Sequence, residues 1–86
     1  MQNNPFNLMQ RLRFRLSKKM LLDEGVFYKY YAVRLHGKHT IVKQNPHSRK
    51  PDFRTISIDD YLCRFRNPDD IATARRELQG FGFALP

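Results

Sequence analysis

The sequence has a single cysteine, Cys63, and no tryptophan. One cysteine cannot form an internal disulfide, and this usage is typical of a reducing compartment. No apolar run approaches the roughly 18 residues that a membrane helix needs. The first ten residues also lack the basic and then apolar pattern of a signal peptide. We therefore expect a cytoplasmic protein with no membrane partner.

Acidic residues are scarce in the first 54 positions. Residues 1–54 hold twelve Lys and Arg against three acids, whereas residues 55–86 hold four arginines against five acids. The net charge of +8 therefore belongs to one part of the chain. Such a division indicates that one face of the molecule meets a polyanion while the rest supports the fold. The plainer alternative is that positive charge only keeps the protein soluble.

The length predicts one small domain over residues 1–86. A hydrophobic fraction of 41% and eleven aromatic residues are enough to build a packed core. Disordered chains are poor in such residues, so a folded protein is expected.

Residues 10–19 alternate arginine with apolar residues, a pattern that suits either a basic strand or a basic helix. A helix over residues 5–22, ending before Gly25, accounts for more of the sequence, because residues 6–24 are rich in good helix formers and contain no turn residue. This helix would bury one apolar arc about 120° wide. The arc consists of Pro5, Leu8, Met9, Leu12, Leu16 and Met20. Beside it, Arg11, Arg15 and Lys18 would form a basic ridge.

Residues 26–44 are rich in Tyr, Phe, Val and Ile and predict two strands joined at Gly37. With Gly37 and Lys38 as the central residues, a type II′ hairpin turn is expected. The core face would then carry Tyr31, Val33, Leu35, Thr40 and Val42. The opposite face, expected to be open to solvent, would carry Tyr28, Tyr30, Arg34, His36, His39, Ile41 and Lys43.

The second half of the chain contains clear signals for loops and helix starts. Residues 45–52 are polar, with two prolines and the adjacent cations Arg49 and Lys50, and predict a mobile loop. Residues 53–57 are short and β-branched and form a possible third strand. The result is an α+β fold: an N-terminal basic helix, a small antiparallel sheet and two short C-terminal helices.

Those two C-terminal helices are predicted from their capping residues. The run from Ser57 to Asp60 resembles a capping box and begins a helix over residues 58–66. Asn67 and Pro68 begin the last helix, which Gly80 is expected to end. The apolar tail that follows either docks on the core or adds an edge strand.

Catalytic signatures are missing from the sequence. It has no phosphate-binding loop, no dinucleotide fingerprint and no Ser-His-Asp arrangement with supporting glycine turns. Both aspartate pairs, at 59–60 and 69–70, fall in first helical turns, where they favour the helix dipole. The acids are therefore assigned to the fold rather than to acid–base chemistry.

The histidines offer two further possibilities. His36 and His39 are expected opposite each other beside the turn, a spacing that could chelate a metal. A closed zinc site needs four ligands, and only His47 and Cys63 remain. Cys63 is expected on the far side of its short helix from Tyr61 and Phe65, so the four ligands cannot be assembled. No metal and no cofactor are therefore expected. The same pair could act as general acid and base in a small RNA-cleaving toxin, but a convincing second element for such a site is missing.

Basic residues with aromatics among them are the remaining pattern, and they predict a non-enzymatic nucleic-acid-binding protein. The predicted contacts are Arg11, Arg15, Lys18, Tyr28, Tyr30, Arg34, His36, Lys38, His39, Lys43, Arg49 and Lys50. DNA is slightly favoured over RNA, because a two-stranded ribbon fits the major groove. The compact size and the absence of a targeting signal would suit a regulator of a phage or mobile element. The alternatives are a protein-binding module or inhibitor that docks on an acidic partner and, third, the toxin.

Overall fold

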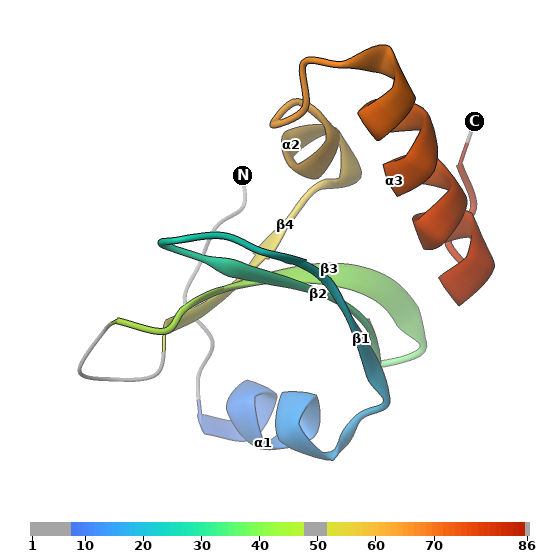
Figure 1. The fold of residues 1–86 in the computed structure, drawn as a ribbon. Coiled ribbons are helices and arrows are strands. Elements are labelled where there is room, and N and C mark those ends of the chain that lie inside the picture. Colours follow the sequence, from blue (N-terminus) through green and yellow to red (C-terminus); the bar gives the residue numbers. More distant parts are fainter. Residues whose placement is uncertain (1–7, 48–51, 86) are drawn as a thin grey trace.

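A computed structural model describes residues 8–47 and 52–85. A four-stranded antiparallel sheet, in the order β1-β2-β3-β4, carries α1 on one face and α2 and α3 on the other (Figure 1). The elements are α1 (Leu8–Leu16), β1 (Lys19–Glu24), β2 (Lys29–Leu35), β3 (Lys38–Asn45), β4 (Asp52–Ile56), α2 (Ile58–Leu62) and α3 (Pro68–Phe81). The α+β class is confirmed, and the sheet has one strand more than the sequence predicted. None of the helices in these two ranges has both the length and the apolar character needed to cross a bilayer.

The first helix is real but much shorter than predicted. It ends at Leu16, because the Ser17 hydroxyl donates to the Arg13 carbonyl at 2.6 Å and the Lys19 ammonium donates to the carbonyls of Phe14 and Arg15, each at 3.3 Å. These side chains satisfy backbone acceptors that a longer helix would have paired. The prediction of a helix to residue 22 was therefore wrong.

The residues beyond the helix form β1 instead. This edge strand pairs antiparallel with β2, with Lys19 opposite Val33 and an irregularity between Leu21 and Asp23. Its half-buried side chains Met20 and Leu22 pack against the core under α2 and α3. The strand thus gains both a hydrogen-bonded neighbour and an apolar contact, which local helix propensity does not provide.

The apolar arc of α1 faces solvent, contrary to the prediction that it is buried. Leu8 and Leu16 are 71% and 77% exposed, whereas Phe14, which lies off that arc, is only 5% exposed. Two residues along a helix correspond to about 200° of rotation, so Phe14 and Leu12 point to nearly opposite sides. The Phe14 ring packs against the sheet, with its centroid 5.5 Å from that of Tyr31 and 4.9 Å from that of Phe53.

The turn between β2 and β3 lies one residue earlier than predicted. Leu35 pairs with Lys38, so His36 and Gly37 are the central residues, with φ angles of 53° and 77°. Positive φ at both positions is characteristic of a type I′ turn rather than the predicted type II′ turn. Because of this shift, each residue of β2 pairs with a residue two positions earlier in β3 than predicted. Side chains alternate between the faces with a period of two, so each residue still lies on the face of the sheet that was predicted for it.

Both faces of the sheet are covered. On one face Phe14, Val33, Leu35 and Val42 form a small core under α1. On the other, a larger core consists of Tyr30, Ala32, Ile41, Tyr61, Ala74, Leu78 and Phe83. The face expected to be open is thus buried under α2 and α3, and that prediction was wrong.

The N-cap predictions for the C-terminal helices are confirmed, whereas α2 ends at Leu62 and not at residue 66 as predicted. The Ser57 hydroxyl accepts from the Asp60 amide at 3.0 Å, and the Asn67 side chain accepts from the Asp69 amide at 2.8 Å. The last helix continues past Gly80 to Phe81, so the predicted end at Gly80 was wrong, and Gly82, with φ 124°, forms its C-cap. The apolar tail then docks on the core, since Phe83 is only 6% exposed.

Phe14 is expected to hold α1 on the sheet. Phe14→Ala should lower the free energy of unfolding by about 3–5 kcal/mol, because it removes a buried aromatic ring. Leu12→Ala, at a position 47% exposed, should cost less than about 1 kcal/mol. Urea unfolding followed by circular dichroism measures both, and equal losses would contradict this packing.

His36 is expected to carry a backbone cost that asparagine would reduce. His36→Asn should raise the free energy of unfolding by about 0.5–1 kcal/mol, because Asn-Gly suits a type I′ turn better. Gly37→Ala is the matched control and should destabilise, since φ 77° disfavours a side chain. If thermal unfolding shows no gain for the asparagine variant, the turn is not of this type.

Candidate nucleic-acid interface

A groove lies beside α1, between the helix and one end of the sheet. Its cavity has a volume of about 790 Å³. We call it the α1 groove, and it is lined by Leu8, Arg11, Leu12, Phe14, Arg15, Lys19, Tyr31, Gln44, Asn45, Pro46 and Phe53. The volume lies within the range of about 300–1,000 Å³ that is typical of small-molecule pockets. It is therefore large enough for a nucleotide.

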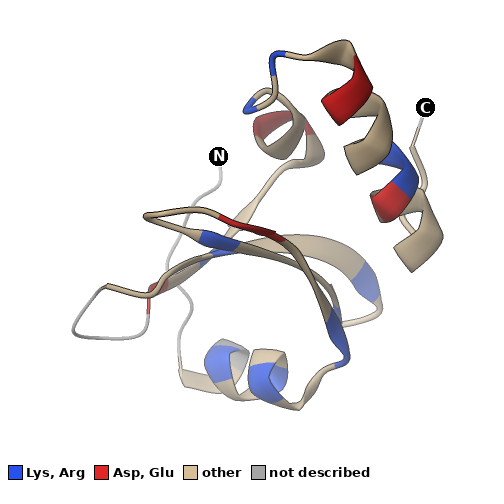
Figure 2. Cartoon of the chain, in the orientation of Figure 1, with Lys and Arg blue, Asp and Glu red and all other residues tan. Residues whose placement is uncertain are grey.

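The rim of the α1 groove is cationic. Arg11, Arg15 and Lys19 line it, and no Asp or Glu is among the lining residues in the described part of the chain. Figure 2 shows blue without red on α1, whereas red appears on β1, α2 and α3. Within residues 8–47 and 52–85, neither arginine has an ion-pair partner. The groove therefore presents positive charge that is not neutralised internally.

Aromatic rings form the floor of the groove. Tyr31 and Phe53 are each half-buried, so part of each side chain remains accessible. Phe14 packs against both rings and is itself buried. Proteins that bind single-stranded nucleic acids combine aromatic side chains with cations in this way, because bases stack on the rings while phosphates contact the positive charge.

Two amide side chains complete the lining at the end of β3. Gln44 and Asn45 are half-buried, and the side-chain Oδ1 of Asn45 accepts from the His47 backbone N–H at 3.0 Å. An amide group both donates and accepts hydrogen bonds. Such groups could read a base edge next to the stacking floor.

Arg11 and Arg15 are the predicted site residues that this groove brings together. Lys18 does not line the groove. The helix ends at Leu16, so Lys18 lies in the link to β1 and does not continue the helical ridge of Arg11 and Arg15. Lys19 lines the groove instead and is held by the carbonyls at the end of α1. Arg49 and Lys50 lie outside the described residues.

Tyr30 lies where a nucleic acid cannot reach its ring. It is 6% exposed, and its ring centroid is 5.6 Å from that of Tyr61. Near the outer end of the same face, Tyr28 is 36% exposed, and the Lys43 ammonium lies 4.0 Å from its ring centroid. Tyr28 and Lys43 therefore remain accessible, but they are on the opposite face from the floor of the α1 groove.

The predicted residues around the β2–β3 turn form a separate exposed group. Arg34, His36 and Lys38 are all exposed, and the Arg13 guanidinium lies 3.5 Å from the His36 ring nitrogen. His39 pairs with Arg34 rather than with His36, and its ring packs against the Phe81 and Phe83 rings. The expectation that His36 and His39 lie opposite each other was therefore wrong.

Arg64 is a second place where a cation meets aromatic rings, but its partners are internal. Its guanidinium lies 3.9 Å from the Tyr30 ring centroid and donates to the Asp23 carboxylate at 2.6 Å. It also lies 5.4 Å from the Tyr61 ring centroid. Burial raises the pKa of Tyr61 to about 12, so its hydroxyl stays neutral in this cluster. We assign Arg64 to the fold.

Five residues that line the groove were not predicted as site residues from the sequence: Lys19, Tyr31, Gln44, Asn45 and Phe53. Tyr31 was assigned to the core face, which it does join, but only in part. The available signal was that Gln44 continues the alternation of Thr40 and Val42, so that face becomes polar at its end. Phe53 pairs with Gln44 across β3 and β4.

Comparison with known proteins gives no relative. No family model matches the chain, and neither the curated proteins nor the solved structures provide a match. Among the described residues, no group of three or more His, Cys, Asp or Glu side chains is placed to hold a metal ion.

Proposed function

We propose that this protein binds single-stranded nucleic acid in the α1 groove and acts as a small, non-enzymatic regulator. The observation that carries the proposal is a groove with three cations on its rim, aromatic rings on its floor and no acid among its described lining residues. Phosphates would contact Arg11 and Arg15, and bases would stack on Tyr31 and Phe53. The Lys19 ammonium is held by backbone carbonyls at the end of α1, so it would add positive charge beside these contacts.

The packing of the sheet favours single strands over a duplex. Reading of the major groove by a two-stranded ribbon needs an exposed sheet face, but α1 covers one face and α2 and α3 cover the other. Bases must also be unpaired to stack on the Tyr31 and Phe53 rings. The earlier preference for DNA rested on the open ribbon, so DNA and RNA strands of the same sequence should be tested together.

The proposal is non-enzymatic because the two acid–base candidates face different neighbours. His36 lies at the β2–β3 turn beside the Arg13 guanidinium, whereas His39 packs against the Phe81 and Phe83 rings. An RNA-cleaving site would need such groups on either side of one phosphate. These different surroundings support binding over cleavage.

Removing the two groove arginines tests the proposal. Arg11→Ala with Arg15→Ala should weaken strand binding roughly tenfold or more at low salt, and it should flatten the plot of log affinity against log salt by about 1.4, since each single-strand phosphate contact contributes about 0.7. Fluorescence anisotropy of labelled DNA and RNA strands over a salt series measures both quantities.

The matched control removes the same charge elsewhere. Arg66 and Arg76 are exposed, after α2 and on α3 respectively. Arg66→Ala with Arg76→Ala should leave the salt slope nearly unchanged. If both double variants lose affinity equally, net charge rather than the α1 groove drives binding, and the proposed site is wrong.

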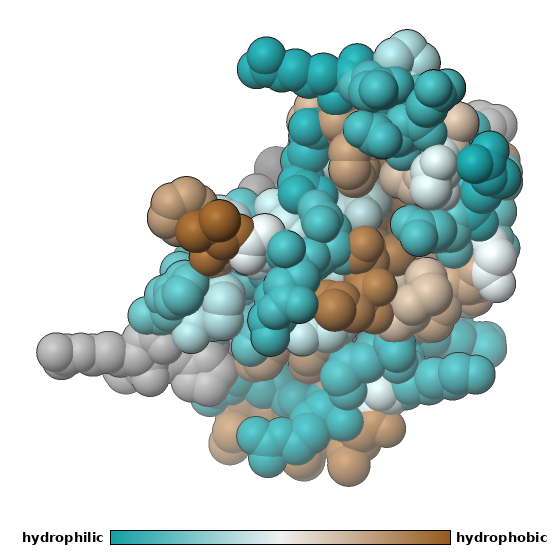
Figure 3. Space-filling view, in the orientation of Figure 1, coloured by the Kyte–Doolittle hydropathy of each residue, from teal (hydrophilic) through white to brown (hydrophobic). Residues whose placement is uncertain are grey.

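A second candidate function is docking on an acidic protein partner. The observation that favours it is the outward apolar surface of α1, made of Leu8, Met9, Leu12 and Leu16, with arginines on both flanks. Figure 3 shows brown along this helix at the surface. Binding of nucleic acid does not require an exposed apolar surface, whereas a protein partner with apolar and acidic side chains would complement it.

Replacing two exposed apolar residues of α1 that do not line the groove separates the two functions. Met9→Ser with Leu16→Ser should leave strand affinity within about twofold, because neither residue lines the α1 groove. A polypeptide that co-purifies with the nuclease-treated wild type but not with this variant would favour protein docking. Loss of strand binding in the variant would instead place these two residues in the nucleic-acid site.

A further inference from the structure

The connection between β1 and β2 presents apolar side chains to solvent. Val26 is 78% exposed and Phe27 is 69% exposed. Figure 3 shows this tip as a brown projection at the end of the β1–β2 hairpin. Neither residue contributes to either core, so their apolar character is not explained by folding.

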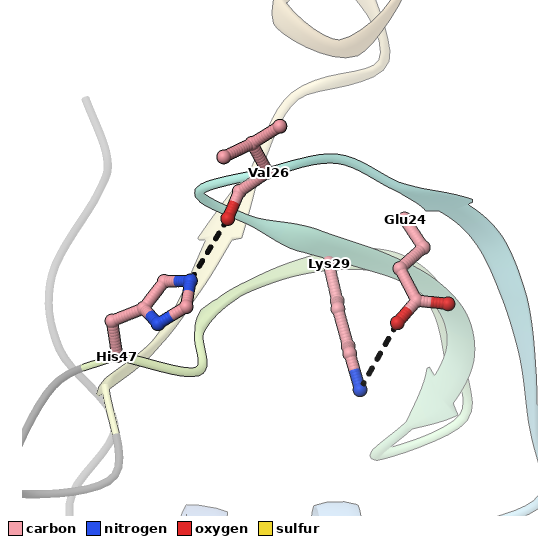
Figure 4. A network of polar contacts seen from close by, with 4 residues as sticks. All are labelled: Glu24, Val26, Lys29 and His47. Atoms are coloured by element: carbon pink, nitrogen blue, oxygen red, sulfur yellow. Dashed lines mark hydrogen bonds and ion pairs between the residues drawn. The ribbon is translucent and has the colours of Figure 1, made fainter.

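The tip is held in place by two hydrogen bonds. The Gly25 amide donates to the Tyr28 carbonyl at 2.9 Å, which closes the turn. From beyond β3, His47 Nε2 donates to the Val26 carbonyl at 2.9 Å (Figure 4). The strands just below are joined by an ion pair between Glu24 and Lys29 at 3.5 Å. A held tip has less conformational entropy to lose on binding than a free loop.

The size of the apolar tip favours a small flat ligand over a protein. A stable protein interface buries about 800 Å² on each partner, which Val26, Phe27 and the partly exposed Tyr28 cannot supply. The face of one aromatic ring is instead the size needed to stack one nucleobase.

The charges beside the tip also favour nucleic acid. The Lys43 ammonium lies over the Tyr28 ring, and both line a small cavity of about 210 Å³ with Asn45, Asp52 and Arg54. The nearby acids are engaged: Glu24 pairs with Lys29, and Asp52 pairs with Arg54 at 3.1 Å. Lys43 is therefore available to meet a phosphate next to a stacked base.

The tip connects to the α1 groove around the end of the sheet. Asn45 lines both the groove and the small cavity beside Tyr28. Pro46 also lines the groove, and the next residue, His47, holds the tip. A strand that leaves the groove past Asn45 would therefore reach Val26 and Phe27.

We propose that Phe27 is a stacking residue for one unpaired base of a nucleic-acid strand bound in the α1 groove, with Lys43 contacting the adjacent phosphate. This inference rests on the proposed function, and it extends the site from one face of the sheet to the β1–β2 tip. Stacking on a ring does not depend on which base is present, so the contact would be tolerant of sequence.

The test uses Phe27→Ala, Phe27→Trp and the matched control Val26→Ala. The probe is a labelled thymidine strand of about 15 nucleotides, near the upper site size of a small single-strand-binding domain. Phe27→Ala should weaken binding about 5- to 150-fold with the salt slope unchanged, because stacking releases no counterions. Val26→Ala should bind within about twofold of the wild type, since a valine side chain offers no ring for stacking.

Phe27→Trp supplies a direct signal, because the natural chain contains no tryptophan. This variant should bind like the wild type, and its fluorescence should be quenched as the strand saturates it. Wild-type affinity in Phe27→Ala, or unchanged tryptophan fluorescence at saturation, would overturn the inference. If Phe27→Ala binds normally while Arg11→Ala with Arg15→Ala does not, only the inferred stacking on Phe27 is wrong and the proposed function stands. If the wild type binds no strand, the proposed function and the inference both fail.

Discussion

Burial of the central strands on both faces is the constraint on which this structure depends. Ala32 and Val33 on β2 and Ile41 and Val42 on β3 are all at most 1% exposed, and consecutive residues point to opposite faces. Each face of the sheet therefore needs a helix packed against it. Phe14 brings α1 to one face, while Tyr61 and Leu78 bring α2 and α3 to the other. The edge strands complete the sheet on either side.

The helices on the two faces of the sheet pack with different density, and the looser packing under α1 leaves the candidate site. On one side, α2 and α3 contribute the buried residues Tyr61, Ala74 and Leu78, and the docked C-terminal segment adds Phe83. On the other side, the described side chains of α1 contribute one buried residue, Phe14, so a groove remains next to it. Because α1 contains arginines and no acid, the loosely packed side is also the cationic side. The packing of α1 thus places positive charge next to the accessible groove.

Among the described residues, cations and aromatic rings meet at three places, and the surroundings of these places distinguish them. Arg64 is paired with Asp23 and stacked on buried rings, so its interactions are complete within the fold. In the α1 groove, the arginines have no ion-pair partner among the described residues, and two rings remain partly accessible. At the β1–β2 tip, Lys43 lies beside the exposed end of the hairpin. Residue type alone does not separate a structural cation from a binding one, but its partners do.

The sequence by itself determined the features that depend on near neighbours. It predicted the α+β class, the Ser57 and Asn67 caps, the members of each hairpin face and the basic character of the first helix, because capping, alternation and charge are local properties. Tertiary structure decided the rest. Helix α1 ends at Leu16 because β1 pairs with β2 and side chains cap the last turn, and its apolar arc faces outward because Phe14 fits between Tyr31 and Phe53. Helical periodicity shows which residues share a side but not what that side meets, so Arg11 and Arg15 could be predicted for the site, whereas Tyr31, Phe53 and Asn45 could not.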